Sequence, residues 1–182
     1  MASAVTGAFC LALAISNANA AHHVSAEGLW SYDEDVLVPT PLDPEDSSNT
    51  DLMNLPANVF VPTTTTAGQK FPAIIFINSW VLEEHEYTSI AKALADKGYI
   101  VFSYTTRGWW SVPGFIDTAG NKDVKDAGNV ISYLINNYPV DPAKIALGGT
   151  SYGSGISLNT ATQDDRVAAV IATSTWGSLV ES

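Results

Sequence analysis

From residue 71 onward, short apolar runs alternate with segments in which apolar residues recur every three or four positions. A continuous apolar run of strand length is typical of a strand with helices packed on both of its faces. Four runs fit that description, at 71–77, 99–104, 144–149 and 167–172. The periodic segments between and after them predict three helices, over 87–94, 124–138 and 152–162.

This alternation of strand and helix predicts the fold class. Parallel strands need a crossover connection, and a right-handed helical crossover that packs back onto the sheet is the common solution. We therefore expect an α/β fold, a doubly wound and mostly parallel sheet with helices on both faces. The sheet is expected to be incomplete at its C-terminal end, because the run at 167–172 would be a buried strand without a following neighbour.

Residues 21–58 have a different character, because they are rich in Pro, Asp, Asn and Ser. We expect a largely irregular, acidic lead-in there, with short strands at 36–38 and 58–62, before the main domain at 59–182. Its carboxylates suit a solvated surface. The alternative is a calcium site, with oxygen ligands from Asp43, Glu45, Asp46, Asn49 and Asp51. No loop glycine follows at the expected place, which counts against calcium.

Composition and charge restrict the possible partners. The chain of 182 residues is 46% hydrophobic and 15% charged, which is typical of a globular protein with a packed core. It carries 19 Asp and Glu against 8 Lys and Arg, a net charge of −11. Such an acidic protein is not expected to bind nucleic acid or an anionic lipid surface.

The first 20 residues predict a signal peptide. An apolar run at 8–15 is followed by Ala18-Asn19-Ala20, which offers the small residues that a signal peptidase requires. Cleavage after Ala20 would make the mature protein secreted or periplasmic. The alternative is a buried helix of small residues, and the run is too short for an ordinary membrane span. Cys10 lies inside this segment, so the mature chain would have no thiol chemistry.

The candidate chemistry lies at Gly149-Thr150-Ser151-Tyr152-Gly153, a G-x-S-x-G motif between a predicted strand and a predicted helix. A serine in a sharp strand-to-helix turn adopts a strained backbone, and the flanking glycines leave it room. The turn exposes the hydroxyl at the carboxyl edge of the sheet. It also directs the N-terminus of the helix there, where free backbone N–H groups stabilise negative charge. We interpret Ser151 as a nucleophile.

A serine nucleophile needs a general base, usually a histidine oriented by a carboxylate, and in this fold both follow the serine. His22, His23 and His85 all precede Ser151. Three explanations stay open. The chain is part of a longer enzyme, it is an inactive hydrolase domain used for binding, or His85 serves as a base out of the usual order. We favour the first, because the missing parts would follow the fourth predicted strand.

From about Phe71 to the end, the chain resembles the X-Pro dipeptidyl-peptidase and cocaine-esterase family of serine α/β-hydrolases. The resemblance is carried by Arg107-Gly108 with Ser111 and Gly114, by Asp123 and Asp126, and by Ser151-Tyr152-Gly153. It implies amide or ester hydrolysis through an acyl-serine intermediate, with no metal or other cofactor and with a small peptide or ester as substrate. Peptidase activity is our first hypothesis and carboxylesterase activity the alternative.

The resemblance also implies roles for individual residues. Ser151 would be the nucleophile, and the backbone N–H of Tyr152 would belong to the oxyanion hole. A second donor would come from the loop after residues 71–77, where relatives often carry tyrosine and this chain carries Trp80. The alternative for Trp80 is an aromatic residue of a lid or of the core. Arg107 would be structural, paired with Asp123 or Asp126 beneath the serine turn. Trp109 and Trp110 would line an acyl pocket or pack between helix and sheet.

Overall fold

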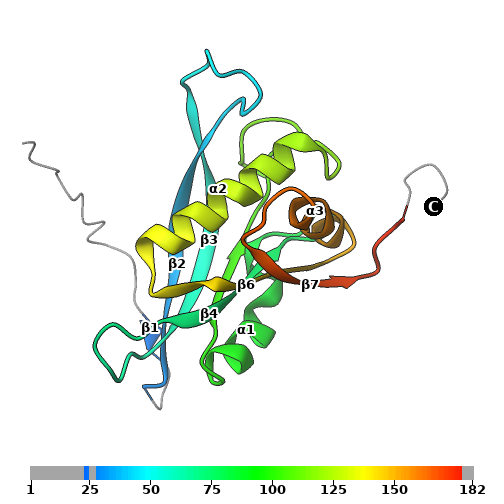
Figure 1. The fold of residues 1–182 in the computed structure, drawn as a ribbon. Coiled ribbons are helices and arrows are strands. Elements are labelled where there is room, and N and C mark those ends of the chain that lie inside the picture. Colours follow the sequence, from blue (N-terminus) through cyan, green and yellow to red (C-terminus); the bar gives the residue numbers. More distant parts are fainter. Residues whose placement is uncertain (1–22, 25–27, 178–182) are drawn as a thin grey trace, which may run out of the picture.

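The apolar runs become neighbouring strands of one sheet in the computed structural model, which describes residues 23–24 and 28–177 (Figure 1). Four strands lie parallel in the order β5-β4-β6-β7. Their bounds are Phe71–Ile77 for β4, Ile100–Tyr104 for β5, Val140–Thr150 for β6 and Val167–Thr173 for β7. Because they are parallel, their carboxyl ends meet at one edge of the sheet.

Helices cover both faces of this sheet, as the sequence predicted. Helix α1, Thr88–Ala95, follows the short 3₁₀ helix η1, Glu84–Tyr87, and packs on one face. Helices α2, Asn121–Asn137, and α3, Tyr152–Ala161, pack together on the other. Strand β4 contributes alternate side chains to the two cores, Ile75 toward α2 and α3 and Phe76 toward α1. The predicted α/β fold is confirmed.

The acidic lead-in is not largely irregular, and that expectation was wrong. Strands β2, Trp30–Pro41, and β3, Leu52–Pro62, form a long antiparallel hairpin, and β3 pairs with β5. The short β1, His23–Val24, adds to β2, so the described residues form a sheet of seven strands in the order β1-β2-β3-β5-β4-β6-β7. Buried side chains alternate with exposed ones along β2. This two-residue period buries one side of the strand despite its many polar residues.

The prolines that suggested an irregular segment lie where a sheet tolerates them. Pro39 and Pro41 belong to the half of β2 that pairs only with β3 among the described strands. An edge strand has one row of N–H groups outside the ladder, so a proline costs no hydrogen bond on that side. A register shift between Asp33 and Val36 interrupts the hairpin and breaks the alternation that would have identified β2 in the sequence.

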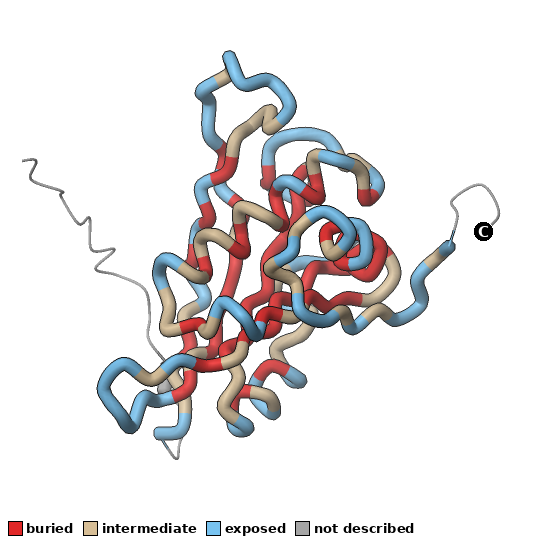
Figure 2. The backbone as a smooth tube through the Cα atoms, viewed as in Figure 1, coloured by how far each residue is buried: buried red, intermediate tan, exposed pale blue. Residues whose placement is uncertain are grey.

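Strand β7 is the opposite edge of the sheet, and it is poorly covered (Figure 2). It pairs with β6, and no other described strand pairs with it. Its residues are partly or fully exposed, and Ile171 retains 45% of its accessible surface. The absence of a following neighbour among the described residues agrees with the prediction for 167–172. The predicted signal peptide at 1–20 lies outside the described residues.

Candidate active site

Ser151 lies in the tight turn between β6 and α3, at the carboxyl edge of the sheet. Its backbone has φ 52° and ψ −113°, a conformation that residues with a side chain rarely adopt. The turn is fixed from β7, because the Ser151 N–H donates to the carbonyl oxygen of Thr173 at 2.9 Å. The predicted strained turn is therefore confirmed, and the nucleophilic role of Ser151 stays a prediction.

The glycines of the motif allow close approach between α3 and β4. A Cβ atom on Gly153 would lie 2.0 Å from the carbonyl oxygen of Ile77, and one on Gly149 would lie 2.6 Å from the carbonyl carbon of Gly153. Both distances are far below van der Waals contact. A side chain at either position would force the turn away from β4, so the conformation of Ser151 depends on both glycines.

The start of α3 presents unpaired donors beside Ser151. The backbone N–H groups of Ser154 and Gly155 both bond to the carbonyl oxygen of Ser151, at 3.1 Å. Those of Tyr152 and Gly153 have no hydrogen-bond partner within residues 28–177. The first N–H groups of a helix carry partial positive charge, so this end of α3 suits a developing oxyanion. The geometry is compatible with the predicted role of Tyr152.

The loop after β4 lies beside the same turn. Glu86 orders it, because its carboxylate accepts hydrogen bonds from the Ser79 N–H at 2.7 Å and from the Ser79 hydroxyl at 2.5 Å. That hydroxyl is also 3.2 Å from the carbonyl oxygen of Thr150, the residue before Ser151. Tyr87 adds a further link, because its phenol oxygen accepts a hydrogen bond from the Thr150 N–H at 3.0 Å.

Trp80, the second predicted oxyanion donor, is on this loop and is half exposed. Its backbone N–H has no hydrogen-bond partner in the described part of the chain. Its indole packs edge-on against Trp109, with centroids 4.7 Å apart, and against Tyr152, at 5.5 Å. The structure thus brings Trp80 next to the residue that follows Ser151, while its donor role stays a prediction. Trp109 is buried, whereas Trp110 is exposed.

A buried polar network lies beneath the turn. Arg107 forms a two-pronged ion pair with Asp126, with Nε and Nη2 at 2.7 and 2.6 Å from the two carboxylate oxygens. Of the two partners left open by the sequence, the structure selects Asp126. Asp123 instead accepts a hydrogen bond from the Tyr152 hydroxyl at 2.6 Å and one from the Ala119 N–H at 3.0 Å. The network therefore connects the helix that begins at Tyr152 to α2 and to the loop that follows β5.

Burial perturbs both carboxyl groups of this network. Desolvation raises the pKa of Asp123 to about 7, against the lowering effect of the Tyr152 hydrogen bond. Desolvation likewise raises the pKa of Asp126 to about 6, although the hydrogen bonds and charge of Arg107 act in the opposite direction. In both cases the desolvation penalty of the ionised carboxylate is larger than the stabilisation that it receives from its hydrogen-bond and charge partners.

No described histidine is hydrogen-bonded to Ser151. His85 precedes α1, is about half exposed, and has its Nδ1 3.5 Å from Glu84 and 3.9 Å from Glu83. His23 belongs to β1, at the edge of the sheet remote from β6. The structure therefore gives no support to His85 as a base out of the usual order.

The described residues contain no cluster of three or more His, Cys, Asp or Glu side chains arranged to hold a metal ion. In the acidic loop between β2 and β3, Asp43, Asp46 and Asn49 accept hydrogen bonds from backbone N–H groups two residues on. Asp43 also pairs with Lys122 at 3.0 Å. These side chains stabilise turns, which is the common local role of Asx residues. No described helix is long and apolar enough to cross a membrane.

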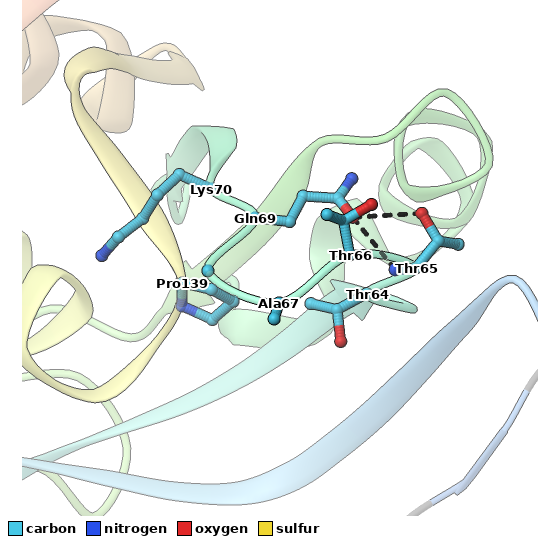
Figure 3. Close-up of a pocket in the computed structure, with 8 residues that line it drawn as sticks. Thr64, Thr65, Thr66, Ala67, Gln69, Lys70 and Pro139 are labelled. Atoms are coloured by element: carbon cyan, nitrogen blue, oxygen red, sulfur yellow. Dashed lines mark hydrogen bonds between the residues drawn. The ribbon is translucent and has the colours of Figure 1, made fainter.

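Two cavities lie away from Ser151. One of about 390 Å³ is lined by residues 64–70 and Pro139, which precede β4 and β6 and so lie at the amino edge of the sheet (Figure 3). There the oxygen of the Gln69 amide accepts hydrogen bonds from the N–H and hydroxyl of Thr65, which closes the loop on itself. The other, of about 550 Å³, lies between the tip of the β2–β3 hairpin and residues 113–117.

The sequence did not reveal three supports of the site. Tyr87 was part of an apolar helical pattern, and no sequence pattern marked Glu86 as a partner of Ser79. The phenol of Tyr152 had no identified partner, although Asp123 was noted. Two of these interactions join residues far apart in the chain, since Tyr87 lies 63 positions before Thr150 and Asp123 lies 29 positions before Tyr152.

Solved structures with this arrangement are α/β-hydrolases. The α/β-hydrolase GrgF from Penicillium sp. sh18 is 25% identical, with a TM-score of 0.56 over 68% of this chain and 42% of its own length. An esterase from Pyrococcus furiosus is 19% identical, with a TM-score of 0.61 over 80% of this chain and 52% of its own. A ferulic acid esterase from Streptomyces cinnamoneus is 15% identical, with a TM-score of 0.60 over 72% and 55%. The chain spans about half the length of these structures and has the α/β-hydrolase fold.

The family can be stated more closely. The model of the X-Pro dipeptidyl-peptidase family (S15 family) matches residues 51–182, and the chain belongs to that family. The match begins within the β2–β3 hairpin and includes Ser151 and the buried network. A search of curated proteins gave no match.

Proposed function

We propose that the complete protein is a serine hydrolase that cleaves amide or ester bonds through an acyl-serine intermediate, with Ser151 as the nucleophile. The observation that carries the proposal is the strained turn at Ser151, with two N–H groups beside it at the start of α3 that have no hydrogen-bond partner among the described residues. Strain of this kind persists only where the surrounding structure enforces it, and it is concentrated at functional sites.

The proposed reaction is a nucleophilic attack by Ser151 followed by hydrolysis of the acyl-serine. The hydroxyl oxygen of Ser151 attacks the substrate carbonyl carbon while its proton passes to a general base. The tetrahedral oxyanion lies against the backbone N–H of Tyr152, with Trp80 as the second donor. Its collapse breaks the bond to the leaving amine or alcohol, which takes the proton from the base. Water then hydrolyses the acyl-serine by the same steps.

The general base and its carboxylate partner are proposed to lie outside residues 1–182. No histidine follows Ser151 in this sequence, and the chain spans about half the length of the hydrolases that it matches. The 182 residues alone are therefore expected to be nearly inactive. Without its base, a serine keeps only the weaker contributions of the oxyanion hole and of substrate binding.

The substrate is proposed to be a small peptide, in keeping with the family, with carboxylesters as the alternative. An inactive binding domain is the rival from another class. All three are separated by assaying the complete polypeptide on an Xaa-Pro anilide and on a chromogenic ester. Turnover of the anilide favours the peptidase, turnover of the ester alone favours the esterase, and turnover of neither favours the binding domain.

The test of the nucleophile compares Ser151→Ala with Ser89→Ala, which changes an exposed serine on α1. Ser151→Ala is expected to reduce kcat by roughly 10⁴-fold or more and to abolish labelling by a fluorophosphonate. Ser89→Ala should keep both. Equal turnover by the unchanged protein and Ser151→Ala would refute the proposal.

Export is a further part of the proposal, supported by the apolar run at 8–15 and by Ala18-Asn19-Ala20. Mass spectrometry of the protein from its native host should give a mature N-terminus at Ala21. A mature N-terminus at Met1 would contradict secretion or delivery to the periplasm by this signal.

A further inference from the structure

Tyr152, the residue after Ser151, is fixed by contacts of its side chain as well as by its place in α3. Tyr152 is 1% exposed, and its ring lies edge-on to Trp80 and Trp109, with centroids 5.5 and 6.1 Å away. Its hydroxyl donates to Oδ2 of Asp123 at 2.6 Å. A bond of this length to a buried carboxyl group is among the stronger hydrogen bonds in proteins. The phenol is thus anchored at the end farthest from the backbone.

The acceptor of this bond is itself immobilised. Asp123 is 0% exposed and lies in the first turn of α2, and its Oδ2 also accepts a hydrogen bond from the Ala119 N–H at 3.0 Å. One turn further along α2, Asp126 is held by Arg107. The other oxygen of Asp123, Oδ1, is buried and has no hydrogen-bond partner among the described residues. A single carboxylate oxygen therefore connects the start of α3 to α2 and to the loop before it.

We propose that Asp123 is a positioning residue, which fixes Tyr152 through its phenol and thereby aims the Tyr152 backbone N–H at the oxyanion. The inference rests on the proposed function. An oxyanion donor acts only within about 2.7–3.1 Å of the developing charge, and a misplacement of about 1 Å can cost about 100-fold in rate. Tyr152 begins its helix, so no preceding helical turn constrains its N–H.

The partly unused carboxyl group makes the inference testable by a conservative change. Because only Oδ2 accepts hydrogen bonds, the amide oxygen of Asp123→Asn can take over both of them, with the NH₂ group in the place of Oδ1. Asp123→Ala cannot. Tyr152→Phe removes the hydroxyl and keeps the ring between the two tryptophans.

The experiment uses the complete polypeptide, with kcat expressed per active site titrated by a fluorophosphonate. Tyr152→Phe and Asp123→Ala are expected to lower this kcat about tenfold with KM within twofold, and the double variant should be no worse than either. Asp123→Asn should stay within about threefold of the unchanged protein. Tyr104→Phe is the matched control, since it removes a buried hydroxyl that has no hydrogen-bond partner among the described residues.

A merely structural pair would lower the melting temperature and the fraction of titratable sites, but not the rate per titrated site. Tyr152→Phe with kcat per site within twofold of the unchanged protein would overturn the inference and leave the serine mechanism intact. Should Asp123→Ala fail to fold, Tyr152→Phe and Asp123→Asn still decide the question. Absence of Ser151 labelling in the unchanged protein would overturn the proposed function and this inference together.

Discussion

The two faces of the sheet are stabilised in different ways. The face covered by α2 and α3, here called the polar face, contains the three fully buried charged side chains of the described residues, Arg107, Asp123 and Asp126. The face covered by α1, here called the aromatic face, is held by stacked rings, with Tyr32 on Phe60 and Phe76 on Tyr87 at centroid distances of 4.3 and 4.5 Å. The charged groups lie on the side where Ser151 turns into α3.

Stability and site geometry therefore depend on different interactions. Burial of rings is non-directional and tolerates small movements, whereas hydrogen bonds between buried charges fix orientation. A buried carboxylate that loses its partner destabilises the folded state strongly. The polar face therefore fixes side-chain orientation, but the loss of one partner there lowers stability more than the loss of a ring contact on the aromatic face. The variants below should separate the two contributions.

The largest effect is expected from Arg107→Met, which keeps most of the buried volume and leaves Asp126 without its ion pair. We expect a loss of about 3–5 kcal/mol in the free energy of unfolding at pH 8, measured by urea denaturation of the complete polypeptide. The double variant Arg107→Met with Asp126→Leu should recover most of it, because no charge is then buried alone. Equal losses in both would mean that Arg107 acts through packing or through its hydrogen bonds to the backbone of Pro41 and Leu42, and not through the ion pair.

Asp123→Asn is expected to stabilise the protein at alkaline pH. The pKa of about 7 for Asp123 in the folded protein lies above the ordinary aspartate value of 3.8, so the folded state binds the Asp123 proton more tightly than the unfolded state does. Below about pH 4 Asp123 is protonated in both states; between pH 4 and 7 only the folded state keeps the proton, so stability falls as pH rises toward 7. The difference in unfolding free energy between Asp123→Asn and the unchanged protein should therefore grow over that range, to at most about 4 kcal/mol. A pH-independent difference would contradict the assignment.

On the aromatic face, Phe60→Leu should cost about 1–2 kcal/mol, because it removes the stacking with Tyr32 and the edge contact with Trp30. No buried charge is involved, so the loss should be the same at pH 5 and pH 8. Thermal unfolding at the two pH values measures it. A strongly pH-dependent loss would show that the two faces are energetically coupled.

The smallest effect is expected from Tyr87→Phe. It keeps the stacking on Phe76 and removes the acceptor of the Thr150 N–H next to the turn. One hydrogen bond of this type contributes about 1 kcal/mol. Chemical denaturation should report that loss, and Phe76→Leu is the companion variant that removes the ring contact instead. A loss of 3 kcal/mol or more would mean that this phenol supports the whole turn.

Features encoded by neighbouring residues could be predicted from the sequence, and features that depend on contacts between distant residues could not. The strand at 71–77 was predicted with its observed bounds, since a strand covered on both faces reads as one apolar run. The turn at Ser151 was predictable because the two glycines that it needs, Gly149 and Gly153, lie within two positions of Ser151 in the sequence. The hairpin was not, because its alternation is broken near Asp33 and its strand pairing is tertiary. The Tyr152–Asp123 bond spans 29 residues and leaves no local pattern.

The position of Arg107 has a consequence for the order of folding. Its guanidinium also donates to the carbonyl oxygen of Leu42 at 3.0 Å, 65 residues earlier, at the end of β2. Until the β2–β3 hairpin docks, that N–H group lacks its acceptor, and contacts of such separation form slowly because a long loop must close first. We therefore expect hairpin docking and burial of Arg107 to be one kinetic step. The turn at Ser151 would then form only after the β2–β3 hairpin, which lies about a hundred residues earlier in the chain, has docked.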